Sequence, residues 1–195
     1  MQKVIVTVIL LWQFGTGVSV AAPLTEVERQ RLIAHLDMTA SWLRDEVSGL
    51  SPAQLAFRRA PDSWTILEVI DHLVVVGPVY WQDLQRAMKA PAGQKTRMSD
   101  EDILWYGIDR TNRERAIPSE VPKGLRDLQN GLAAHRTLHA RLLQYIRTTQ
   151  DDLRSHIVER QGCDAYQWAL LISTHEQRHI LQIREIKADP KFPVK

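Results

Sequence analysis

Residues 164–187, DAYQWALLISTHEQRHILQIREIK, have the period of a long amphipathic helix. Their apolar stripe recurs every three or four residues and consists of Ala165, Trp168, Ile172 and Ile186. His175 and His179 lie on the same stripe, four residues and therefore about one helical turn apart. We expect a core-facing helix that carries two imidazoles inward, so the rest of the chain must supply the elements that cover it.

Three further segments have helix length and the same apolar period. They lie at about residues 24–47, 64–89 and 125–149. The pair Asp62-Ser63 can begin the second of these helices, because a side-chain oxygen accepts from the exposed amides of a first turn. Pro78 lies inside the same helix and lacks a backbone donor, so we expect a bend there.

The connection between the second and third helices is long. Pro91, Gly93, Pro118 and Pro122 flank one short helical candidate in this segment, Asp100 to Arg115. The sequence has neither the alternating apolar pattern of β-strands nor an internal repeat. It therefore predicts an all-α fold, a four-helix bundle that is up-down with a long crossover between helices two and three.

Residues 1–21 have the layout of a signal peptide. Lys3 is their only charge, an apolar run follows, and Ser19-Val20-Ala21 supplies the small residues that precede a cleavage site. A membrane anchor is the alternative, but a span needs about 20 apolar residues and this run is interrupted by Gln13 and Gly15. We expect residues 22–195 to form one exported domain, periplasmic or secreted, with no stable membrane anchor after cleavage.

Net charge and cysteine content argue against nucleic-acid binding and against a disulfide-stabilised fold. The formal net charge of the 195 residues is +2, and removal of Lys3 with the leader leaves +1, so nothing favours a nucleic-acid partner. Cys163 is the only cysteine, which excludes an internal disulfide. We expect Cys163 to be a small buried residue, although a reactive thiol at the start of the last helix stays open.

Three histidines are candidates for a metal site. His175 and His179 are about 40° apart around one helix, so both can reach a single ion. His72 lies on the inner stripe of the second helix, flanked by valines and other apolar residues. Buried imidazoles cost free energy unless their nitrogens are satisfied, and a divalent metal ion satisfies all three. Such a site keeps open positions for water.

The chain resembles the DinB/YfiT-like metal-dependent bundles. The resemblance rests on Trp64, on Asp71-His72-Leu73 in the second helix, on Tyr166-Gln167-Trp168, and on His175-x-x-x-His179-x-x-Gln182 in the last helix. It implies that His72, His175 and His179 bind zinc, nickel or a similar divalent ion. Members include thiol S-transferases and hydrolases, and dimers are common among similar bundles, so a homodimer is possible for this chain.

His175-Glu176-x-x-His179 also fits the zinc-protease pattern, in which the glutamate is the general base. Those proteases need a third ligand further along, and no histidine follows His179. The protease interpretation is therefore disfavoured. Glu176 remains the candidate catalytic proton acceptor, and its alternative is a solvated carboxylate that pairs with neighbouring residues.

His135 and His139 have the same spacing in the third helix and are the main rival pair. Leu138 and Leu142 can set the buried face so that both histidines lie at its edge, and we expect them to be partly exposed. Their role stays open.

These features give three functional hypotheses. The first is a hydrolase in which metal-activated water attacks a small-molecule substrate. The second is a metal-dependent thiol S-transferase, which an exported protein disfavours because small thiols are abundant in the cytoplasm. The third is a non-enzymatic bundle in which the metal adds stability or is itself the cargo.

Overall fold

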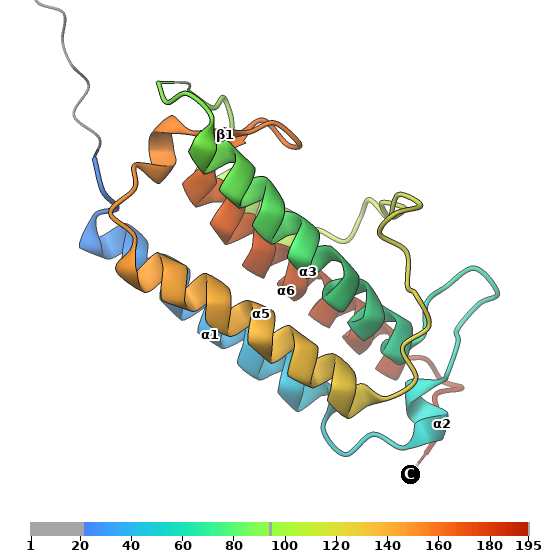
Figure 1. The fold of residues 1–195 in the computed structure, drawn as a ribbon. Helices are drawn as coiled ribbons and strands as arrows, with labels where there is room; N and C mark the ends of the chain where they lie inside the picture. The colour runs from blue at the N-terminus through green and yellow to red at the C-terminus, as the bar shows by residue number, and fades with distance from the viewer. Residues whose placement is uncertain (1–21, 94, 195) are drawn as a thin grey trace, which may run out of the picture.

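The computed structural model describes residues 22–93 and 95–194, so the expected signal peptide over residues 1–21 lies outside the described part. Four long helices dominate the fold (Figure 1). They are α1 (Glu26–Val47), α3 (Ile66–Lys89), α5 (Leu128–Thr148) and α6 (Ala165–Lys187). Shorter elements join them: α2 (Pro52–Leu55), α4 (Asp100–Ile108), the 3-10 turn η1 (Leu153–Ser155), β1 (Ile157–Val158) and β2 (Cys163–Asp164). The expected four-helix bundle is confirmed.

The crossover determines how the four helices are arranged. Each long helix packs against two others, α1 and α3 each against both α5 and α6. Figure 1 shows that α1 and α6 end where α3 and α5 begin. Helices α3 and α5 therefore run in the same direction, and the segment that contains α4 returns the chain along the bundle, as the predicted long crossover requires.

Helix boundaries follow from capping residues. Thr65 is the N-cap of α3 and forms a reciprocal capping box with Glu68, so the helix begins after Thr65 and not at the expected Asp62-Ser63. Asp164 caps α6 in the same way with Gln167. Helix α3 continues through Pro78 to Lys89, as expected for one helix.

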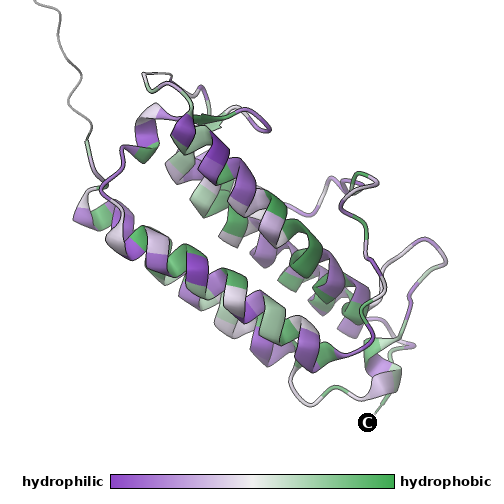
Figure 2. Ribbon diagram, in the orientation of Figure 1, coloured by the Kyte–Doolittle hydropathy of each residue, from purple (hydrophilic) through white to green (hydrophobic). Residues whose placement is uncertain are grey.

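The core consists of two apolar clusters, one near each end of the bundle. Between them lies a belt of buried polar side chains on the middle turns of the long helices. Its members include Thr39, Asp71, His72, Ser173, Thr174, His175, Glu176, Arg178 and His179. Figure 2 shows the first half of α3 as mainly hydrophobic, with polar residues prominent on the visible faces of α1 and α5. Buried polar groups need partners, so this belt is where function is expected.

Helix α4 covers one side of α6 at this belt. Gly107 permits the close approach, because a Cβ at this position would lie 2.9 Å from Cβ of Thr174 and 3.1 Å from its carbonyl oxygen. The crossover is thereby held against the turn of α6 that carries His175.

Three local expectations were incomplete. The crossover helix ends at Ile108 and not at Arg115, because the backbone carbonyls of Asp109 and Asn112 in the following segment turn to accept from Arg178 of α6. The short α2 and the two-stranded β1–β2 ribbon were not expected, because each is too short to show a period. No helix in residues 22–93 or 95–194 is long and apolar enough to cross a membrane.

Candidate metal centre

The structure brings the three expected histidines together in the middle of the bundle. His72 comes from α3, and His175 and His179 come from α6. Nε2 of His175 lies 3.3 Å from Nε2 of His72 and 3.1 Å from Nε2 of His179. All three side chains are buried, and they are the one group of potential ligands of this kind in the described part of the chain. That they bind a metal stays a prediction.

The crossover loop fixes the orientation of His72. Its Nδ1 donates to the backbone carbonyl of Glu120 at 2.6 Å, so its Nε2 carries the lone pair. The neighbouring Asp71 holds the same loop, because one carboxylate oxygen accepts from the amides of Lys123, Gly124 and Leu125 at 2.6–2.9 Å. Asp71 therefore holds the loop that supplies the Glu120 carbonyl, and this carbonyl orients the candidate ligand His72.

His179 is oriented from its own helix. Its Nδ1 lies 2.8 Å from Oε1 of Gln182, less than one turn later, and donates to that oxygen. Trp64 packs on the site from outside, with its ring 4.9 Å from the His72 ring and 6.2 Å from the His179 ring. An outer ring nitrogen that donates to a fixed acceptor is typical of metal-binding histidines.

The chemistry of the donor set fits a metal ion. Because His72 and His179 carry their protons on Nδ1, both present an unprotonated Nε2 to His175. The Nε2 of His175 has at most one proton and can satisfy only one of them. A cation accepts all three lone pairs, and nitrogens 3.1–3.3 Å apart match the edges of a coordination shell with bonds of about 2.0–2.1 Å.

Burial keeps the three imidazoles neutral. It lowers the pKa of His72, lowers the pKa of His175 to about 3, and lowers the pKa of His179 well below its ordinary value. The His72 imidazole and Arg178 add to the effect of burial on the pKa of His175. At neutral pH the nitrogens are therefore available as ligands without the loss of a proton.

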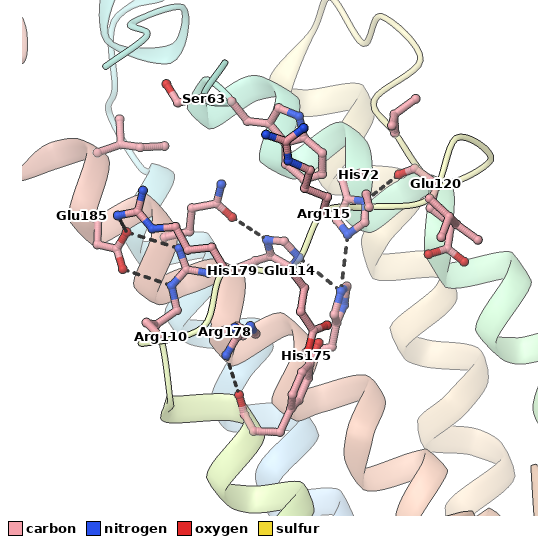
Figure 3. A pocket seen from close by; sticks show the side chains of 18 of the residues that line it. Ser63, His72, Arg110, Glu114, Arg115, Glu120, His175, Arg178, His179 and Glu185 are labelled. Carbon is pink, nitrogen blue, oxygen red and sulfur yellow. Dashed lines mark hydrogen bonds and ion pairs between the residues drawn. The ribbon is translucent and has the colours of Figure 1, made fainter. Parts of the chain in front are cut away.

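The triad opens into a large pocket of about 960 Å³. Its other walls come from the α2–α3 loop, the crossover, the β1–β2 turn and the end of α6. Figure 3 shows Glu114, Arg115, Arg110 and Arg178 among the side chains around the imidazoles. A cavity of this size is typical of a small-molecule site.

Glu176 does not line this pocket. It points to a neighbouring side of α6, toward α1 and α5, where its carboxylate lies 3.1 Å from Nε2 of His135 and accepts from the hydroxyl of Thr39 at 3.2 Å. The alternative of a solvated carboxylate is wrong, since Glu176 is only 4% exposed. Helix α1 packs on this face of α6, and His135 of α5 reaches the same carboxylate, which accounts for both outcomes. A catalytic role of Glu176 stays a prediction.

His135 and His139 do not form a comparable cluster. Both are partly exposed, as expected, and their ring centroids lie 6.3 Å apart, against 4.5 Å for His175 and His179. Where His175 and His179 meet a third imidazole, His135 meets the carboxylate of Glu176. Burial lowers the pKa of His135, but this carboxylate raises it by more, so the net shift is upward.

Cys163 is fully buried in strand β2, as expected for a small core residue. Burial raises the pKa of its thiol to about 12. It takes no part in the pocket.

Several pocket residues were missed by reasoning from the sequence. Glu114, Arg115 and Glu120 lie in the crossover, and Arg160 lies in the β1–β2 turn. Loop residues have no period, so only their approach to the helices in space identifies them. The polar content of residues 109–120 was the one available signal.

Comparisons with known proteins agree with this fold. YuaE of Bacillus subtilis (strain 168), an uncharacterized protein, is 28% identical over 151 residues, which is 73% of this chain and 89% of that protein. The structure of YfiT from Bacillus subtilis, described as a probable metal-dependent hydrolase with an unusual four-helix bundle topology, aligns with a TM-score of 0.57. The alignment has 19% identity and covers 84% of this chain and 88% of YfiT. The family model of the DinB superfamily matches residues 24–183, and the chain therefore belongs to the DinB superfamily.

Proposed function

We propose that this protein is a metal-dependent hydrolase of small molecules, with His72, His175 and His179 as the ligands of one divalent ion, zinc or nickel. The observation that carries the proposal is the convergence of three lone-pair nitrogens on one point at the base of a 960 Å³ pocket. An ion bound there would supply a Lewis acid that lowers the pKa of water toward about 7.

The chain's own residues have separate roles in this proposal. The Glu120 carbonyl and the Gln182 side chain hold two imidazoles in the orientation that leaves Nε2 free. Glu114 lines the pocket, whereas Glu176 does not, so Glu114 replaces Glu176 as the proton acceptor. Trp64 and Tyr80 supply apolar walls that shield the reacting groups from bulk water.

The test uses protein purified without an affinity tag and stripped of metal by a chelator. Chromogenic esters and amides should be hydrolysed only after zinc or nickel is restored. His179→Ala should lose this activity, and His139→Ala, a change of the same size in the rival pair, should keep it. A rate that is unaffected by metal removal would contradict the proposal, and metal-dependent transfer to an added thiol without hydrolysis would favour the S-transferase alternative.

The variants Glu114→Gln and Glu176→Gln show which of the two carboxylates accepts the proton. If Glu114 accepts the proton, the substitution lowers kcat by about 100-fold, the usual contribution of a general base, and leaves the metal content unchanged. A rate that falls only in Glu176→Gln would restore Glu176 to this role.

We also propose that the mature protein is exported. The support is the pattern of residues 1–21, with Ser19-Val20-Ala21 before the expected cut. N-terminal sequencing of the protein from the producing cell should begin at Ala22. An intact Met1 in the mature protein would contradict export with cleavage.

A further inference from the structure

The pocket above the triad contains more positive charge than its ion pairs use. Six arginines line it: Arg59, Arg110, Arg113, Arg115, Arg160 and Arg178. Carboxylates that also line it neutralise three of them. Arg59 pairs with Asp189 at 3.3 Å, Arg110 with Glu185 at 3.0 Å, and Arg160 with Glu120 at 2.6 Å. The other three are Arg113, Arg115 and Arg178.

Arg178 is buried and has only neutral partners in the described part of the chain. Its guanidinium donates to the backbone carbonyls of Tyr106, Asp109 and Asn112. The side chain is next to His179 in sequence and ties the segment after α4 to the helix that carries two of the candidate ligands. It therefore anchors the loop and adds a charge that forms no ion pair within the described residues.

Arg113 and Arg115 lie further along the same loop. Arg113 comes no closer than 3.9 Å to Glu185, which already holds Arg110 through both of its oxygens. Arg115 forms no ion pair with any residue that the structure describes. Among the lining carboxylates, Asp62 and Glu114 are likewise without an ion pair in residues 22–93 and 95–194. Three cations thus face two carboxylates, before the charge of a metal ion is added.

The loop that carries these arginines is held at both ends. Arg178 binds its beginning, and Asp71 accepts three amides at residues 123–125 after its end. Both anchors are adjacent in sequence to candidate metal ligands, His179 and His72. The loop is therefore fixed over the triad, and Figure 3 shows Arg115 among the side chains that surround the imidazoles.

We propose that this pocket selects substrates that carry an anionic group of carboxylate or phosphate type, which Arg113 and Arg115 bind while the reacting group lies at the three histidines. A guanidinium pairs with both oxygens of such a group and stays charged at every relevant pH. A pocket of about 960 Å³ has room for one molecule that reaches both sites. The inference rests on the proposed function, because it assigns the substrate class of the same site.

The test is calorimetry on the full mature chain loaded with zinc. The probes are glutarate and 3-phosphonopropionate, which carry two anionic groups, and butyrate, which carries one and cannot bind the metal and the arginines at the same time. We expect at least one of the two probes with two anionic groups to bind about tenfold or more tightly than butyrate, as charge-assisted hydrogen bonds to an arginine imply.

The double variant Arg113→Gln/Arg115→Gln should lose this preference and keep the affinity for butyrate. Both positions are exposed in a loop, so the fold should be unaffected. Arg44→Gln, an exposed arginine on α1 outside the pocket, is the matched control and should behave as wild type. The inference is overturned if neither probe with two anionic groups binds more tightly than butyrate, or if the double variant retains the preference.

Calorimetry requires no turnover, so the two proposals fail separately. Zinc-loaded protein that prefers the probes with two anionic groups but hydrolyses no ester or amide contradicts the proposed hydrolase and supports the anionic subsite. Hydrolysis with no such preference supports the hydrolase and contradicts the subsite.

Discussion

Two pairs of histidines with the same four-residue spacing have different surroundings in this protein. His175 and His179 on α6 meet a third imidazole, His72, with Nε2 distances of 3.1–3.3 Å. His135 and His139 on α5 lie with nearly parallel rings 6.3 Å apart, and His135 faces the carboxylate of Glu176. The comparison shows that spacing places two imidazoles on one face, whereas a third donor and fixed acceptors for the outer nitrogens make a ligand set.

Removal of one imidazole from each pair should give the largest contrast. His175→Ala should weaken zinc binding by more than about 100-fold, because it removes a direct ligand and not merely an outer partner. His135→Ala should leave the metal content unchanged. Elemental analysis of untagged protein measures both, with circular dichroism as the check on folding. Loss of metal from His135→Ala alone would transfer the site to α5.

The two pairs should also affect the pH dependence of stability with opposite signs. The folded pKa of His175 is lowered to about 3 from an ordinary 6.5, so the unfolded chain binds its proton first. Stability of the metal-free protein is therefore lost as pH falls below 6.5, by about 3 kcal/mol at pH 4.5 from this group alone. The pKa of His135 is raised, so its contribution is present below 6.5 and is lost as pH rises through the folded pKa.

Urea denaturation of metal-free protein between pH 4.5 and 7.5 measures this dependence. His175→Asn should reduce the loss of stability on the acid side of the curve, and His135→Asn should remove the stabilisation that His135 gives below pH 6.5. An acid side with the same slope in wild type and His175→Asn would contradict a neutral buried imidazole at this position.

The clamp beneath His72 should have an intermediate effect. Asp71→Asn weakens the acceptor of three loop amides and so loosens the Glu120 carbonyl that orients His72. Zinc affinity should fall by about 10–100-fold, as for other partners of ligating histidines. Competition with a chromogenic chelator gives the affinity. Asp45→Asn, an exposed aspartate on α1, should match wild type, and equal affinity for both variants would exclude a positioning role for Asp71.

The smallest effect is expected from the contact between Glu176 and His135 of α5. Glu176→Gln should lower the free energy of unfolding by about 1–2 kcal/mol, because it weakens the buried contact with His135. Zinc affinity should stay within twofold of wild type, since Glu176 does not line the pocket. Denaturation and chelator competition on the same samples separate the two effects. Unchanged stability with reduced zinc binding would place Glu176 at the metal.

The sequence predicted the bundle and the triad for related physical reasons. A helical period of 3.6 residues determines which side chains share a face, so His72, His175 and His179 could be placed on inner stripes without coordinates. The same period did not determine whether Glu176 faces the metal site. It lies about 60° from His179 around α6, and only its contacts with Thr39 of α1 and His135 of α5 show that it is directed away from the pocket.

The crossover could not be predicted beyond its existence. Its contacts join residues far apart in sequence, as when Asp71 binds the amides of residues 123–125 and Arg178 binds carbonyls near Asp109. These contacts have no repeating pattern, so neither the clamp nor the arginines that line the pocket have a signal in a single sequence. The export of the chain and its identity as an enzyme remain predictions.

The most direct test of the metal centre is an anomalous difference map from a crystal of zinc-loaded protein, measured at the zinc absorption edge. One peak about 2.0–2.2 Å from Nε2 of His72, His175 and His179 is the expected result. A peak beside His135 and His139, or an empty triad in protein that elemental analysis shows to contain zinc, would contradict it.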